Sequence, residues 1–323
     1  MVAVKREIDS AAPLVEGRSR TKVLVTGASG FVGRRLVRRL ATMADVDLVV
    51  AARSDGEGGA GMVSVDICDP SSVSNALAGV SPDVVVHLAA QSSVGLGRSA
   101  AADTWKTNLC GSIALGEAIA RWSPKSILLY VSSAEVYGAA YLDGVVDEST
   151  IPRPTSSYAW TKLAAETALA DLLPEDTRLI VARPSNHSGA GQDERFVLPS
   201  LARQIREGGV EVRVGNLSAK RDFLHVEDVV DAYLALLRHS NSLTSRSVFN
   251  VSAGVSVSIQ ELLEKMIELS GAQISVAVDP SRLRPVDTPV ACIDSLRLRQ
   301  ATGWAPMRGV DEVLRELLFC GIR

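Results

Sequence analysis

The chain has 323 residues, 46% of them hydrophobic and 22% charged. This composition excludes wholesale disorder, and the length suits one large α/β domain or a large domain with a smaller lobe. Lysine and arginine total 34 against 37 acidic residues, and the net charge of −3 excludes a broad nucleic-acid-binding surface. No apolar run approaches the roughly 18 residues of a membrane-spanning helix.

Residues 1–20 mix both charge signs and lack the apolar core of a secretory signal, which predicts a flexible arm. The four cysteines are widely spaced and form no C-x-x-C pair, so we expect free thiols in a reducing cytoplasm. The four histidines have no metal-ligand spacing, so we expect no metal site.

From Thr21 onward, short apolar runs alternate with amphipathic stretches. Continuous Val, Ile and Leu runs predict strands buried on both faces, at 22–26, 46–52, 62–65, 83–88, 126–131 and 178–182. Helical periodicity falls between them, at 31–43, 71–78, 103–121 and 157–172. This alternation predicts a doubly wound parallel sheet, a Rossmann fold, over residues 21–184.

The pattern becomes less regular after residue 184. Strands are predicted at 211–214, 247–251 and 273–278, and helices at 226–238 and 259–269. We therefore expect residues 185–323 to form a smaller C-terminal α/β lobe that mainly binds substrate, with some segments returning to the main sheet.

A glycine-rich loop, TGASGFVG (26–33), connects the first predicted strand to the first helix. Glycines allow a tight turn and let backbone N–H groups approach a pyrophosphate, which the helix N-terminus also attracts. An ordinary strand–helix turn is the alternative, but the position at the start of an α/β unit favours a dinucleotide site. The residues expected to contact it are Gly27, Ser29, Gly30, Phe31, Val32 and Gly33.

The tip of the second predicted strand favours NADP(H) over NAD(H). A carboxylate there would bind the adenosine ribose, but the sequence places Arg53 at this point, and its guanidinium can pair with a 2′-phosphate. Alternatively, Arg53 is a solvated loop residue and Asp55 reaches the ribose.

Two further strand ends are candidate cofactor contacts. Asp66, followed by Ile67, can accept a hydrogen bond from an adenine amino group, or can simply form a turn before the next helix. Leu88, Ala89 and Ala90 end the fourth predicted strand, where two small side chains would let a cofactor lie against the backbone.

Three residues predict acid–base chemistry. Tyr158 and Lys162 are about one helical turn apart and share a helix face. An ammonium beside a phenol is expected to lower the pKa of the tyrosine, which can then act as a general acid or base. Ser133, at the end of the fifth predicted strand, can bind the same substrate oxygen. Y-x-x-x-K alone occurs by chance, so the prediction depends on its combination with the glycine loop and the serine.

The chain resembles the extended short-chain dehydrogenase/reductase family that acts on nucleotide sugars. The resemblance covers nearly everything from Thr21 onward and rests on TGASGFVG (26–33), HLAA (87–90), VSSAEVYG (131–138), SYAWTK (157–162), ARPSN (182–186) and RDFLHVEDVV (221–230). It implies that Ser133, Tyr158 and Lys162 are catalytic. It also implies that Asn108 is the active-site asparagine and that Asn186 contacts a substrate phosphate.

The resemblance also implies how the substrate binds and how subunits associate. Arg221 and Arg284 match arginines that clasp the substrate diphosphate; alternatively, they are surface residues paired with Asp222 or Asp287. Arg195 and Val197 are further candidate substrate contacts. The family implies a homodimer joined by the helices near 103–121 and 157–172.

Within the family, the nearest resemblance is to GDP-4-keto-6-deoxy-D-mannose reductases, carried by segments 186–205, 214–223 and 279–287. The chain departs from that pattern near the sugar pocket, at Ser157, Ser185, Ser188, Ala190 and His225. We therefore expect NADP-dependent reduction of the C4 ketone of a nucleotide-activated 4-keto-6-deoxysugar, with a GDP-linked sugar favoured.

Glu135 leaves a second interpretation open. Sugar-nucleotide 4,6-dehydratases place Thr-Asp-Glu at this strand end, whereas this chain has Ser133-Ala134-Glu135 and lacks the aspartate of the acid–base pair. The alternative function is a nucleotide-sugar 4-epimerase or 4,6-dehydratase with tightly held NAD, in which Glu135 would join the catalytic residues. A third possibility is a non-catalytic dinucleotide-binding sensor.

Overall fold

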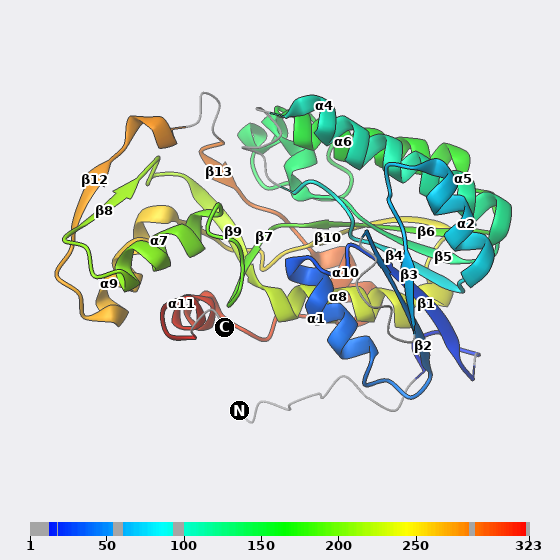
Figure 1. Ribbon diagram of the computed structural model, residues 1–323. Coiled ribbons are helices and arrows are strands. Elements are labelled where there is room, and N and C mark those ends of the chain that lie inside the picture. Colours follow the sequence, from blue (N-terminus) through cyan, green and yellow to red (C-terminus); the bar gives the residue numbers. More distant parts are fainter. Residues whose placement is uncertain (1–12, 18, 54–60, 93–99, 284–287, 321–323) are drawn as a thin grey trace.

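The computed structural model describes residues 13–17, 19–53, 61–92, 100–283 and 288–320. Seven parallel strands form one large sheet in the order β10-β6-β5-β4-β1-β2-β3 (Figure 1). They are β1 (Thr21–Thr26), β2 (Val46–Ala52), β3 (Met62–Ser64), β4 (Val84–His87), β5 (Ile127–Val131), β6 (Arg178–Pro184) and β10 (Arg246–Val251). The predicted doubly wound parallel α/β sheet is confirmed.

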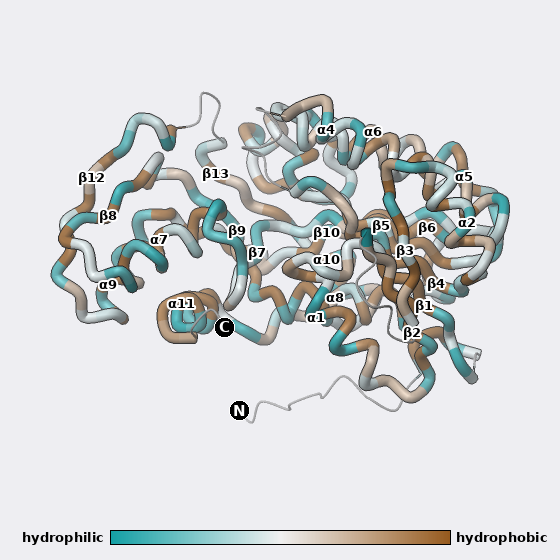
Figure 2. The backbone as a smooth tube through the Cα atoms, in the orientation of Figure 1, coloured by the Kyte–Doolittle hydropathy of each residue, from teal (hydrophilic) through white to brown (hydrophobic). Residues whose placement is uncertain are grey.

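Helices cover both faces of this sheet, because successive strand residues point to opposite sides. Val84 and Val86 join the core beneath α1 (Phe31–Leu40), α8 (Val226–Arg238) and α10 (Leu296–Thr302). Val85 joins the opposite core, which is closed by α2 (Pro70–Val80), α5 (Gly111–Trp122) and α6 (Ser157–Leu172). Hydrophobic residues accordingly concentrate along the central strands (Figure 2).

A second group of elements forms beyond β6. The strand β9 (Lys220–His225) pairs with β7 (Asn186–Ser188), β11 (Ser256–Ser258) and β13 (Val290–Ala291), and β8 (Glu211–Val214) pairs with β12 (Ser275–Val278). The helices α7 (Val197–Arg206), α9 (Ile259–Ser270) and α11 (Val310–Phe319) share one apolar core with these strands. The strand β10 instead leaves this group and pairs with β6 in the large sheet.

The sequence predicts a single helix over 103–121, whereas the chain forms α4 (Ala101–Trp105), a π-helical turn (Lys106–Cys110) and α5. The π turn adds a residue without interrupting the apolar periodicity, which is why the pattern does not reveal it. Two 3-10 turns, Ala134–Tyr137 and Ala139–Asp143, also follow β5 where no element is predicted.

The end of the predicted N-terminal arm is packed into the protein. Leu14 is fully buried and Val15 is 4% exposed, both in the core beneath α1. The backbone N–H of Leu14 donates to the Asp45 carboxylate at 2.6 Å. The expected flexible arm therefore does not extend over these two residues.

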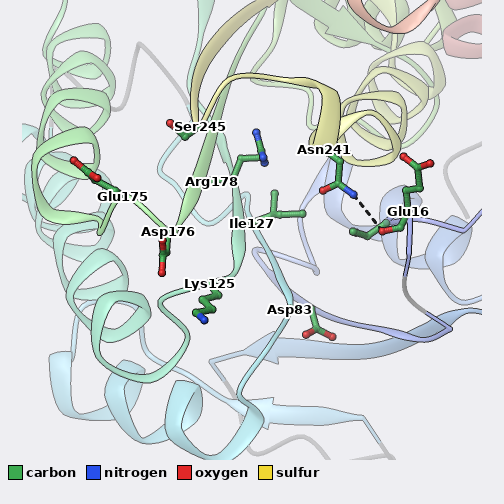
Figure 3. Close-up of a pocket in the computed structure, with 10 residues that line it drawn as sticks. Glu16, Asp83, Lys125, Ile127, Glu175, Asp176, Arg178, Asn241 and Ser245 are labelled. Carbon is green, nitrogen blue, oxygen red and sulfur yellow. Dashed lines mark hydrogen bonds between the residues drawn. The ribbon is translucent and has the colours of Figure 1, made fainter.

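A polar pocket lies at the edge of the sheet where the strands begin (Figure 3). Asp83 precedes β4, Lys125 precedes β5 and Arg178 begins β6, so all three residues line this pocket. Doubly wound sheets bind ligands at the opposite edge, beyond the carboxyl ends of the strands. Within the described residues, no helix is both long enough and apolar enough to cross a bilayer.

Candidate active site

Ser133, Tyr158 and Lys162 come together beyond the carboxyl end of β5. Ser156 caps α6 by accepting from the Ala159 N–H at 3.2 Å, which places Tyr158 in the first turn. The exposed fractions are 8% for Ser133, 7% for Tyr158 and 4% for Lys162. The Ser133 hydroxyl hydrogen-bonds to the Tyr158 phenol, and Lys162 Nζ donates to the Val131 carbonyl at 2.8 Å. The predicted trio is therefore one buried cluster.

Burial determines the protonation of this cluster. It raises the pKa of Tyr158 to about 12, although the hydrogen bond with Ser133 opposes the rise. It lowers the pKa of Lys162 to about 8, although the Glu166 carboxylate opposes the fall. The expectation that Lys162 lowers the tyrosine pKa is wrong for this structure, because burial disfavours the charged phenolate and is the largest cause of the shift. A phenol that keeps its proton can donate it to an oxygen atom held by Ser133.

The glycine loop forms the cradle that the sequence predicts. Gly27 has φ +70°, and a Cβ there would lie 2.5 Å from the Ala89 nitrogen. A Cβ on Gly33 would lie 2.2 Å from the Gly27 carbonyl oxygen. The amino end of α1 has no side-chain cap and no acidic residue in its first turn. Its free N–H groups and partial positive charge can therefore bind a phosphate.

The remaining cofactor candidates lie at neighbouring strand ends. Arg53 is exposed just after β2, and Asp55 falls outside the described residues. The Asp66 carboxylate accepts from the Cys68 N–H at 2.9 Å, and this hydrogen bond closes the turn that the sequence offered as the alternative role of Asp66. Ile67 is buried. Half-buried Leu88, Ala89 and Ala90 follow β4 beside the glycine loop.

His87 links two strand ends to the active site through a chain of hydrogen bonds. The Ser112 hydroxyl donates to the Asn108 carbonyl at 2.6 Å. Ser112 therefore accepts from His87 Nε2 at 3.1 Å, and the unprotonated Nδ1 accepts from Thr26 at 2.7 Å. Thr26 Oγ1 in turn accepts from the Ala89 N–H at 3.3 Å. This arrangement needs a neutral ring, and burial lowers the pKa of His87 to about 3.

Asn108 lies in the π turn with its side-chain amide fully engaged. Its Oδ1 accepts from the Gln91 N–H at 2.8 Å, and its Nδ2 donates to Thr161 Oγ1 at 3.0 Å. Thr161 donates to the Tyr158 carbonyl at 2.7 Å. Asn108 thus holds the first turn of α6 in place.

Glu135 lies beside the cluster, in the 3-10 turn after β5. Its backbone N–H donates to the Ser133 hydroxyl oxygen at 3.2 Å. Its half-buried carboxylate raises the pKa of Tyr158, so its negative charge helps to keep the phenol protonated. This effect of Glu135 supports a reaction in which Tyr158 donates a proton more directly than it supports a dehydratase reaction, in which water is removed from the sugar.

The predicted substrate residues lie on the second group of elements. Asn186 is half-buried in β7, and Arg221 in β9 is 8% exposed and donates to the Thr288 carbonyl at 2.6 Å. Arg195 pairs with Asp193 at 2.6 Å, and Val197, 39% exposed, begins α7. Arg284 and Asp287 lie outside the described residues.

The Asp222 carboxylate, considered as an alternative partner of Arg221, accepts from three successive backbone N–H groups. These belong to Ala253, Gly254 and Val255, at 2.7–3.1 Å. The Ser185 hydroxyl also donates to it, at 2.8 Å. Ser185, a departure from the reductase pattern, thus fixes the start of the substrate-side segment through Asp222.

A cluster of His225, Glu312 and Glu316 has side-chain ligand atoms within 4.8 Å of one another. His225 Nδ1 accepts from the Glu227 N–H at 3.1 Å, so a neutral ring carries its proton on Nε2. His225 Nε2, which lies 3.1 Å from Glu316 Oε1, therefore carries a proton. To bind a metal at this position, the nitrogen would instead need a free lone pair. The cluster is better explained as the amino-terminal cap of α8 linked to α11.

Sequence reasoning missed one part of the site. Glu166, one turn beyond Lys162, forms a buried ion pair with Arg183 in ARPSN. The available signal was a pair of opposite charges, Glu166 and Arg183, each within an otherwise apolar segment. Charged residues are rarely buried unless they are paired, so each of the two predicts a partner. The sequence alone does not show which partner each charge has.

Comparisons with known proteins agree with this geometry. The NAD dependent epimerase/dehydratase family matches residues 23–252. The chain is 34% identical to the GDP-6-deoxy-D-mannose reductase of Pseudomonas aeruginosa, over 92% of this chain and 96% of that protein. The structure of RMD from Pseudomonas aeruginosa complexed with NADPH has a TM-score of 0.76 and 33% identity, covering 92% and 98% of the two chains.

A second solved structure, the Thermus thermophilus UDP-glucose 4-epimerase complex with NAD, has a TM-score of 0.80 and 27% identity. It covers 92% of this chain and 97% of its own. Family and fold therefore agree with the motifs in the sequence. The chain belongs to the NAD dependent epimerase/dehydratase family.

Proposed function

We propose that this protein catalyses the NADPH-dependent reduction of the C4 ketone of a GDP-linked 4-keto-6-deoxysugar. The observation that carries this proposal is the buried cluster of Ser133, Tyr158 and Lys162 beside a glycine cradle that bears no acidic residue. The similarity to a GDP-6-deoxy-D-mannose reductase, and to a structure complexed with NADPH, supports the choice of substrate and cofactor.

The residues present fit a dinucleotide phosphate. The cradle at Gly27 and Gly33 has no room for a Cβ, and the amino end of α1 has no side-chain cap, so its first backbone N–H groups are open to a pyrophosphate. In our proposal Ser29, Gly30, Phe31 and Val32 complete this contact. Arg53 binds the 2′-phosphate, Asp66 and Ile67 flank the adenine, and Leu88, Ala89 and Ala90 lie along the cofactor.

The chemistry follows from the protonation states of the cluster. NADPH, when bound, supplies the hydride that reduces the C4 carbonyl carbon. Tyr158 donates its proton to the carbonyl oxygen, so that the ketone becomes an alcohol. Ser133 donates a hydrogen bond to the same oxygen, and the Lys162 ammonium stabilises the phenolate that remains.

The substrate residues are assigned by the same reasoning. Arg221 and Arg284 neutralise the diphosphate, and Asn186 donates to one of its oxygens. Arg195 and Val197, at the amino end of α7, contact the nucleoside. Residues 21–184 mainly hold the cofactor and residues 185–323 mainly hold the substrate, with β10 contributing to the large sheet.

A spectrophotometric assay tests the proposal. Purified protein, NADPH and a GDP-4-keto-6-deoxysugar should show a stoichiometric loss of NADPH absorbance and formation of the 4-hydroxy product. The 4-epimerase and 4,6-dehydratase alternative is favoured by the similarity to a UDP-glucose 4-epimerase structure with NAD. It predicts product without net NADPH consumption, an outcome that would overturn the reductase proposal.

We also propose that the protein is a cytoplasmic homodimer joined through α5 and α6. The two charged residues in the middle of α6, Lys162 and Glu166, are both buried, whereas Trp160 is 48% exposed on its outer side. A large exposed aromatic side chain on the outer side of a helix favours a second copy of the chain. Light scattering should give twice the monomer mass, and Trp160→Glu should yield a monomer; a monomeric wild-type protein would contradict the assignment.

A further inference from the structure

A buried ion pair lies directly behind the catalytic cluster. Glu166 on α6 pairs with Arg183 on β6, and their side chains are only 8% and 7% exposed. Arg183 Nη2 lies 2.6 Å from Glu166 Oε2, and Nε lies 3.1 Å from Oε1. Desolvation makes a buried ion pair a weak source of stability, so its position beside the active site requires another explanation.

The carboxylate of this pair fixes the strand end that carries Ser133. Three successive residues, the last of β5 and the two that follow it, each contact α6. The Val131 carbonyl accepts from Lys162, the Ser132 hydroxyl donates to Glu166 Oε1, and the Ser133 hydroxyl bonds to Tyr158. The central contact belongs to Glu166. Its loss would free the segment between the two catalytic contacts.

Arg183 orients the pair rather than merely neutralising it. Its Nη1 donates to the Tyr137 hydroxyl at 3.1 Å, and that hydroxyl donates to Asn250 Oδ1 at 2.8 Å. The guanidinium is therefore held on the side of Tyr137 and β10. The carboxylate faces Ser132 and the helix turn of Lys162.

The charge of Glu166 acts on a crowded set of titratable groups. Lys162 Nζ lies 5.1 Å from the ring centre of Tyr130, and burial strongly disfavours its ammonium form. The negative charge of Glu166 opposes that effect. The titratable and charged groups that face Lys162 or its neighbours in the cluster are Tyr158 and Glu166 on α6, Tyr130 on β5, His87 on β4, Glu135 after β5, Arg183 on β6 and Tyr233 on α8.

We propose that Glu166 is a positioning residue, whose buried carboxylate aligns the Val131–Ser133 strand end with α6 and places a negative charge one helical turn from Lys162. Arg183 is the counterion that makes this carboxylate tolerable in the interior. The reaction that benefits is the proposed reduction, so the inference rests on that function only for its catalytic consequence.

A lysine titration tests the proposal without any enzyme activity. Glu166→Gln combined with Arg183→Met removes the carboxylate together with its counterion, so that Arg183 is not left unpaired in the interior. The protein is labelled with ¹³C at lysine, and the Lys162 side-chain signal is assigned by its loss in Lys162→Arg. In the double variant this signal should titrate at least about half a pH unit lower than in wild type. The matched control is Asp228→Asn with Arg308→Met, which removes another ion pair, joined at 2.7 Å, whose carboxylate is 1% exposed.

The outcomes separate this inference from the proposed function. An unchanged Lys162 titration in the Glu166 variant, or an equal shift in the Asp228 control, would overturn the positioning role. If the reductase reaction is present, kcat should fall about 10- to 100-fold in the Glu166 variant through misalignment, while the KM for NADPH stays within about threefold. A protein without reductase activity would refute the proposed function but leave the titration result valid.

Discussion

His87 Nε2 donates to Ser112 Oγ at 3.1 Å, and the direction of this bond is fixed because Ser112 donates its own proton to Asn108. The ring must therefore stay neutral, with Nδ1 accepting from Thr26. One buried imidazole thus connects the end of β1, the end of β4 and the π turn that carries Asn108.

This relationship predicts a specific loss of stability in acid. The pKa of His87 falls to about 3 in the folded protein, against 6.5 as its ordinary value. The unfolded chain binds a proton below pH 6.5 and the folded protein does not, so stability is lost as pH falls from 6.5 towards 3. At pH 5 this single group should cost about 2 kcal/mol relative to pH 7.5.

Urea unfolding of His87→Gln tests the predicted loss of folding stability at acid pH. The variant should be less stable at pH 7.5 by about 1–3 kcal/mol, because Thr26 loses its acceptor. It should nevertheless lose about 2 kcal/mol less than wild type on going to pH 5. Parallel pH dependences would contradict the prediction, and the exposed His239→Gln is the control for the substitution itself.

How far the sequence predicts this site depends on whether a feature is local. The glycine turn and the Tyr158–Lys162 spacing are local, so strand and helix periodicity place them well, and the predicted bounds of α6 match the structure. The π turn at Lys106–Cys110 has no separate hydrophobic signal. The partner of Glu166 is 17 residues away on another element, and only the folded chain shows it.

The sign of the Tyr158 pKa shift shows the same limit. Sequence spacing predicts an ammonium beside the phenol, and the attraction between those charges alone would lower the tyrosine pKa. Burial depends on how α6 packs against β5, which no spacing shows, and here burial is the largest cause and raises the tyrosine pKa.

Tyr158→Phe should remove most turnover and leave cofactor affinity nearly unchanged. The phenol is the proton donor in the proposed reaction, and loss of a general acid typically costs about 10²- to 10⁴-fold in rate. Steady-state kinetics gives kcat, and NADPH fluorescence gives the cofactor Kd. Activity within a few-fold of wild type would rule out Tyr158 as the acid.

The pH dependence of reduction should reflect Lys162. Its pKa is about 8 in the structure, so the stabilising ammonium is present below that value and is lost as pH rises through it. We therefore expect kcat/KM to fall above about pH 8, well before Tyr158 titrates near 12. A profile that remains flat to pH 10 would show that the ammonium is not needed.

Gly33→Ala should abolish dinucleotide binding. The new Cβ would lie 2.2 Å from the Gly27 carbonyl oxygen, so the cradle must open to admit it. Gly79→Ala in α2 is the matched control, because a Cβ there meets nothing within 4 Å, and alanine is the better helix former by up to about 1 kcal/mol. Calorimetry with NADPH should detect binding in the control only; equal affinities would contradict the cradle.

Arg53→Ala should separate the two nicotinamide cofactors. In the proposed complex the exposed Arg53, just after β2, pairs with the 2′-phosphate, and a hydrogen-bonded charge of this kind contributes about 1.5–3 kcal/mol. The Kd for NADPH should therefore rise about 10- to 150-fold, whereas the Kd for NADH, which lacks that phosphate, should stay within about twofold. Arg38→Ala, an exposed arginine of α1, removes the same charge from another position and serves as the control. If NADPH and NADH weaken equally in Arg53→Ala, the guanidinium does not read the 2′-phosphate, and the preference for NADPH must come from elsewhere in the cleft.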